Sequence, residues 1–167
     1  MTAITEASRV RAVRGAALGL ITASLIEFVV GMGLNLFITI TRDHPGAHGN
    51  SGYFVRSLNS VVWGLSHFGL LPFHIGIGFV LFLGSIRLAV ATFRAPGRGI
   101  RLASLVGLLA VAGAGFNGAS FLDFDDDFSS MLMTVLFAIA VFCFALVLYN
   151  CRPHDIPAPT TRLPEAN

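Results

Sequence analysis

Four long apolar runs occupy most of this 167-residue chain, and they constrain its fold more than any other feature. A run of about 20 apolar residues crosses the ~30 Å hydrocarbon layer of a bilayer as a helix. Only 12% of the residues are charged, about half of the share typical of soluble domains. The sequence therefore predicts an all-α membrane protein built as a four-helix transmembrane bundle.

The expected spans cover about residues 15–41, 72–93, 101–122 and 128–150, within a transmembrane domain at 15–151. The first run is too long for the core of a signal peptide, so we expect it to remain as a span. Residues 1–14 form an N-terminal segment, and the Pro-rich residues 152–167 are expected to be a disordered tail.

The segment 42–71 combines an external loop with a second kind of helix. Residues 42–52 contain Pro, Gly and Asn, as loops do, whereas residues 53–71 are again apolar. One helix over 57–93 would be about 55 Å long, far more than the bilayer thickness. We therefore expect a break near Gly69 and Pro72, with an extra interfacial helix up to about Ser66 before the second span.

Arginines are distributed unequally between the two sides of the predicted bundle. One side carries Arg9, Arg11, Arg14, Arg94, Arg98, Arg101 and Arg152, whereas the other carries Arg42, Arg56 and most of the acids. The positive-inside rule then predicts an integral plasma (inner) membrane protein with both termini cytoplasmic. No basic patch is interleaved with exposed aromatics, so nucleic acid is not an expected partner.

Polar side chains interrupt the apolar runs at Glu27, Asn35, His74, Asn117 and Arg87. An ionisable group in hydrocarbon costs a few kcal/mol or more, so such residues usually face a protein interior, a partner or a wet cavity. Counting along each span places Asn35, His74 and Asn117 at similar depth in the outer half of the bilayer. These residues are therefore expected to form one polar layer.

His74 has three possible roles. It can hold helices together by bonding to Asn35, Asn117 or a backbone carbonyl. A neutral imidazole can also ligate haem iron, copper or zinc, and a histidine can carry protons. His67 lies about 10 Å from His74 along a continuous helix, too far to share a metal unless the chain bends or a neighbouring subunit supplies the missing ligand. Otherwise His67 is an interfacial histidine.

Glu27 is the most costly residue to place in lipid, and its partner is left open. It can stay protonated, accept a hydrogen bond from Asn35 or another polar neighbour, or pair with Arg87. Arg87 can also extend to the inner surface without a partner.

Asp43, His44 and His48 form a second candidate metal site, because two histidines and a carboxylate suit zinc or copper. The alternative is a solvated loop. The acidic turn at 123–127 is interpreted as a helix cap and a topology signal.

Small residues line one face of the third span at Gly107, Ala114 and Gly118. Such a face lets helices approach closely, and it also favours a homo-oligomer. The alternative is that these residues leave room for a flat cofactor.

The architecture is similar to that of small four-helix membrane b-type cytochromes, although only His74 lies clearly within a span. We therefore expect a small membrane redox protein that binds haem b, copper or zinc and meets a membrane redox partner. In that reading His74 is the ligand, Asn35 and Asn117 orient it, and Glu27 is a buried proton or charge partner. A structural subunit and an oligomeric conduit for protons or small solutes are the alternatives.

Overall fold

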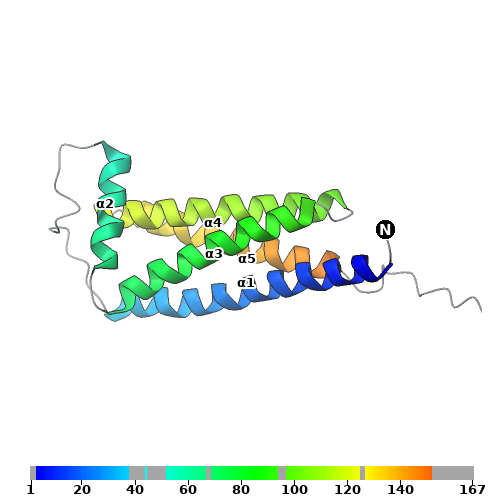
Figure 1. Ribbon diagram of the computed structural model, residues 1–167. Coiled ribbons are helices and arrows are strands. Elements are labelled where there is room, and N and C mark those ends of the chain that lie inside the picture. The colour runs from blue at the N-terminus through cyan, green and yellow to red at the C-terminus, as the bar shows by residue number, and fades with distance from the viewer. Residues whose placement is uncertain are drawn as a thin grey trace, which may run out of the picture.

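The computed structural model describes residues 3–37, 44, 52–66, 69–93, 97–124 and 127–151. Within these residues the chain forms α1 (Ala3–Phe37), α2 (Tyr53–Leu65), α3 (Leu70–Phe93), α4 (Arg98–Phe124) and α5 (Asp127–Asn150). Figure 1 shows the four long helices side by side, with α2 across the end of the bundle where α1 ends and α3 begins.

All of the long helices in the described part of the chain, four in number, are apolar and long enough to cross a membrane. Their outward surfaces carry large apolar side chains, such as Val29 and Leu109, which are each 69% exposed. These are the features of a multi-pass helical membrane protein, because apolar side chains are stable against lipid and costly against water.

The helix bounds differ from the expected spans mainly in α1, which begins at Ala3 and not near residue 15. Polar residues lie beyond the apolar run but do not break the helix. Arg14 extends from α1 to the end of α5, where its Nη1 donates to the carbonyl oxygens of Leu148 at 3.1 Å and Cys151 at 2.6 Å. A cation in this position satisfies carbonyls that have no partner within their own helix.

The break between α2 and α3 lies where the sequence places it. Gly69 has a φ of +122°, a conformation that glycine adopts without the steric cost of a Cβ atom. Pro72 lies in the first turn of α3, where its missing N–H costs no helical hydrogen bond.

Glycines lie at close contacts in two of the antiparallel helix pairs, α1–α3 and α4–α5. A Cβ at Gly84 would lie 2.8 Å from Leu20 Cδ2, and one at Gly33 would lie 3.2 Å from Leu70 Cδ1, so these contacts align α1 with α3. Between α4 and α5, a Cβ at Gly107 would lie 2.9 Å from Phe144 Cε1. Close approach at such positions is a common way for membrane helices to pack.

Candidate functional site: a Glu–His pair between α1 and α3

Glu27 of α1 and His74 of α3 meet between their helices. Nδ1 of His74 lies 2.9 Å from Oε1 of Glu27. The Glu27 side chain is only 9% exposed and that of His74 is 25% exposed. An acid and a base therefore share a largely dry position, in which their electrostatic interaction is stronger than in water.

Each polar side chain lies over a glycine of the opposite helix. Gly31 follows Glu27 by one turn, and a Cβ there would lie 3.3 Å from Cε1 of His74. Gly78 follows His74 by one turn, and a Cβ there would lie 3.5 Å from Oε1 of Glu27. The two glycines therefore provide the space in which the imidazole and the carboxylate approach each other.

The pair is incompletely hydrogen-bonded. Oε2 of Glu27 is buried, and no hydrogen bond reaches it from the described residues. Nδ1 of His74 likewise has no partner in line for a hydrogen bond, despite its short distance to Oε1. A buried polar oxygen in this state costs about 1–3 kcal/mol, and protonation or a small bound donor would relieve that cost.

The predicted polar layer does not assemble as expected. Asn35 is exposed, because Gly33 lies opposite Leu70 and Asn35 therefore extends past the first residue of α3. Asn117 donates its amide to the Gly113 carbonyl of its own helix at 2.8 Å. Neither amide contacts His74 in the described part of the chain, so the contact is between Glu27 and His74 and not among the three expected residues.

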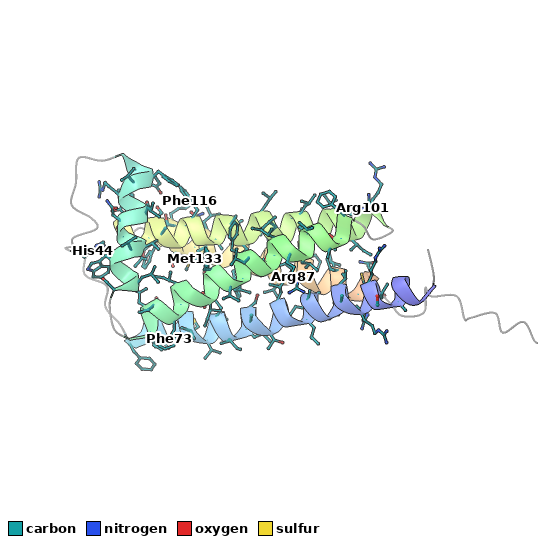
Figure 2. The ribbon with its side chains drawn as sticks, viewed as in Figure 1. His44, Phe73, Arg87, Arg101, Phe116 and Met133 are labelled. Carbon is teal, nitrogen blue, oxygen red and sulfur yellow. The ribbon has the colours of Figure 1, made fainter. Side chains whose placement is uncertain are left out.

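Arg87 is not the partner of Glu27. It is exposed, and it lies in the half of the bundle away from α2 and His44 (Figure 2). The carboxylate of Glu27 instead reaches His74, in the first turns of α3.

Side chains of α5 lie over three glycines of α4. Gly107 faces Phe144, Gly113 faces Leu136, and a Cβ at Gly118 would lie 3.2 Å from Sδ of Met133. These contacts show close packing of α4 against α5 at the three glycines. The two cysteines of the chain, Cys143 and Cys151, are buried and are not joined by a disulfide.

A second polar group, which the sequence does not disclose, lies where α2 covers the end of α4. Arg56 Nη2 lies 3.3 Å from Oδ1 of Asp123, whose side chain is 0% exposed. Ser60 donates to the same oxygen at 3.5 Å. Arg56 and Asp123 are 67 residues apart, so no local pattern could have paired them.

His44 belongs to this second polar group. It is 2% exposed and stacks on Trp63 with ring centroids 4.2 Å apart. Its Nε2 lies 2.7 Å from the Leu122 carbonyl oxygen, so Nε2 carries the donated proton. No group of three metal-binding side chains occurs among the described residues, and Asp43, His48 and His67 lie outside those residues.

Asp127 lies in the first turn of α5, as expected for an acid that favours the helix dipole. Asp123, from the same acidic turn, is instead buried against α2 and paired with Arg56.

Comparisons with known proteins add no assignment to this geometry. No family model matches the chain, and no curated protein or solved structure matches it.

Proposed function

We propose that this chain is a proton-transferring membrane protein whose exchangeable proton resides on the Glu27–His74 pair. The observation that carries the proposal is the 2.9 Å contact between a carboxylate and an imidazole inside the apolar part of a helical bundle. Ionisable residues at such positions commonly serve ion or proton pathways.

The chemistry of the pair suits proton exchange. A proton on His74 gives a neutral ion pair, and transfer to Glu27 gives a neutral acid beside a neutral base. The two forms have the same net charge, so interconversion adds no net charge to the apolar interior. The exposed quarter of His74 would let the proton leave toward a second copy of the chain or toward bound water.

A redox protein with His74 as ligand to haem b, copper or zinc is the second candidate. Metal-bound histidines usually direct their other ring nitrogen to a carboxylate or a carbonyl. Nδ1 of His74 lies 2.9 Å from Oε1 of Glu27, and a small ring rotation would align the two, which would leave Nε2 for a metal. In this candidate Glu27 orients the ligand, and a second subunit or a membrane redox partner would complete the coordination.

The proposed topology has both termini in the cytoplasm of a plasma-membrane protein and α2 at the outer interface. The arginine distribution supports this orientation. The composition of α2 supports its placement, because its buried residues are Ser57, Ser60 and Gly64. Its exposed residues include Phe54, Val55, Leu58, Val62 and Leu65, so the apolar side of this helix would lie against lipid.

Proton transfer is tested in proteoliposomes that contain a trapped pH-sensitive dye and are driven by a potassium diffusion potential. Wild-type protein should acidify or alkalinise the interior according to the sign of the potential, and Glu27→Gln and His74→Gln should abolish this flux. Asn35→Ala is the matched control, because that polar residue is exposed on the same helix. Wild-type flux in both variants of the pair, or no flux in the wild type, would refute the proposal.

The redox candidate is tested by optical spectra of gently purified protein before and after dithionite, with elemental analysis of the same sample. A Soret band that shifts on reduction and is lost in His74→Ala would support haem. Metal without that band would support copper or zinc, and neither signal would remove this candidate. Full activity of a folded His74→Ala, Glu27→Ala double variant in its native membrane would instead indicate a structural subunit.

A further inference from the structure

Four buried polar atoms beneath α2 have no hydrogen-bond partner in the described part of the chain. They are Oδ2 of Asp123, Nδ1 of His44, Nε of Arg56 and Oγ of Ser57. They come from α2, from the end of α4 and from the segment between α1 and α2. Each such atom costs about 1–3 kcal/mol when it is left unpaired, so the group indicates an occupant from outside the chain.

The donors and acceptors define that occupant. Oδ2 of Asp123 accepts hydrogen bonds, and so does Nδ1 of His44, because Nε2 of the same ring donates to the Leu122 carbonyl. Nε of Arg56 donates, and the Ser57 hydroxyl can do either. The occupant must therefore both donate and accept.

The charges of these side chains and their burial further limit which molecule could occupy the group. Arg56 already balances the charge of Asp123 at 3.3 Å, so the group does not call for an additional ion. The Asp123 side chain is 0% exposed and that of Arg56 is 28% exposed, and His44 is 2% exposed, so a small molecule suits this position better than a large one. Water is the smallest neutral molecule that donates and accepts, and buried waters typically occupy such positions.

An apolar layer separates this group from the Glu27–His74 pair. Leu34, Leu71 and Leu122 are buried together there, with Val61, Trp63 and Ile75 packed against them. Leu71 precedes His74 by one helical turn, Leu34 follows Glu27 by two turns, and Leu122 directly precedes Asp123. Along the bundle, the polar group around Asp123 comes first, the leucine layer follows it, and the Glu27–His74 pair lies beyond that layer.

We infer that α2 covers a buried water-binding site formed by Asp123, His44, Arg56 and Ser57, and that the leucine layer separates this site from the Glu27–His74 pair. The water in this site would supply the protons that reach the Glu27–His74 pair. This second role rests on the proposed function, whereas the bound water does not.

Water-edited solid-state NMR on isotope-labelled wild-type protein in liposomes tests the site directly. Polarisation from water should reach Cγ of Asp123 and Cβ of Ser57 as fast as it reaches exposed residues. Ser85 and Ser104 are the internal controls, because they are equally buried but bond to the carbonyls of Leu81 and Arg101. Transfer to Ser57 and Asp123 as slow as transfer to these controls would overturn the inference.

The role of the apolar layer is tested with Leu71→Ala, which thins it. Proton flux in proteoliposomes should rise relative to wild type, whereas Val90→Ala, an exposed position on the same helix, should leave it unchanged. If the wild type conducts protons and Leu71→Ala conducts them at the same rate, the leucine layer is not a barrier to protons. Water at Ser57 in a protein without any flux would support the site and refute only the proposed function.

Discussion

The imidazole of His74 rests on Gly31, where an added Cβ would lie 3.3 Å from Cε1 and 3.6 Å from Nδ1. The absence of a side chain at Gly31 therefore sets how closely His74 can approach α1. The same helix turn carries Glu27, so the carboxylate and the space for its partner are built into one stretch of sequence.

Replacing Gly31 with leucine should push the imidazole off α1 and separate it from Glu27. The overpacking is expected to cost about 1–3 kcal/mol of stability, and proton flux should fall to the level of Glu27→Gln. Gly76→Leu is the matched control, since Gly76 is exposed on α3 and a Cβ there meets nothing within 4 Å. Retention of normal flux by Gly31→Leu would show that the short contact is not required.

Replacing Gly107 with alanine should destabilise the α4–α5 pair. The added Cβ would lie 2.9 Å from Cε1 of Phe144 and 3.2 Å from Cβ of Cys143, and the latter atom is close to the backbone and cannot rotate away. We expect a loss of about 1–3 kcal/mol, measured by thermal or denaturant unfolding in detergent. Gly115→Ala meets nothing within 4 Å and should be neutral or slightly stabilising. Equal stabilities for the two variants would contradict the packing described above.

Removing the Arg14 side chain should weaken the attachment of α1 to the end of α5. Arg14→Ala leaves the Leu148 and Cys151 carbonyls without this donor, for an expected cost of about 1–2 kcal/mol. Arg11→Ala provides the comparison, because Arg11 lies one turn earlier on α1 and is exposed. Faster hydrogen exchange at the end of α5 should appear only in Arg14→Ala, and its absence there would count against the cap.

The Arg56–Asp123 pair should show thermodynamic coupling between α2 and α4. A double-mutant cycle with Arg56→Gln and Asp123→Asn is expected to give about 0.5–3 kcal/mol. The fluorescence of Trp63, the only tryptophan in the chain, reports on the same helix. A parallel cycle with the exposed Asn59→Ala should give a coupling near zero. A coupling near zero for Arg56 as well would mean that the pair does not hold α2 in place.

Hydropathy and turn residues predicted the helices well. The ends of α3, α4 and α5 lie within a few residues of the ends of the expected spans. Gly69 interrupts the helical conformation before α3, as expected. Helix formation in lipid depends on local backbone bonding and on side chains that tolerate hydrocarbon, and both are readable from a window of sequence. The start of α1 differed because a helix can continue beyond the apolar part of its sequence.

The partners of the polar residues were not predictable in the same way. The partner of Glu27 was left open and is His74, and Asp123, in a turn interpreted as a helix cap and a topology signal, is buried against Arg56. In a membrane the lipid-facing and interior-facing sides of a helix are both apolar, so hydropathy does not say which face points inward.

The sequence by itself determined that this is a helical membrane protein, where its helices run and which few side chains carry its polar chemistry. The tertiary structure alone decided that Glu27 meets His74 over two glycines, and that α2 turns its serines inward over Asp123. The physical reason is that helix formation is local. Helix rotation and register, in contrast, are set by close packing between segments that are far apart in the chain.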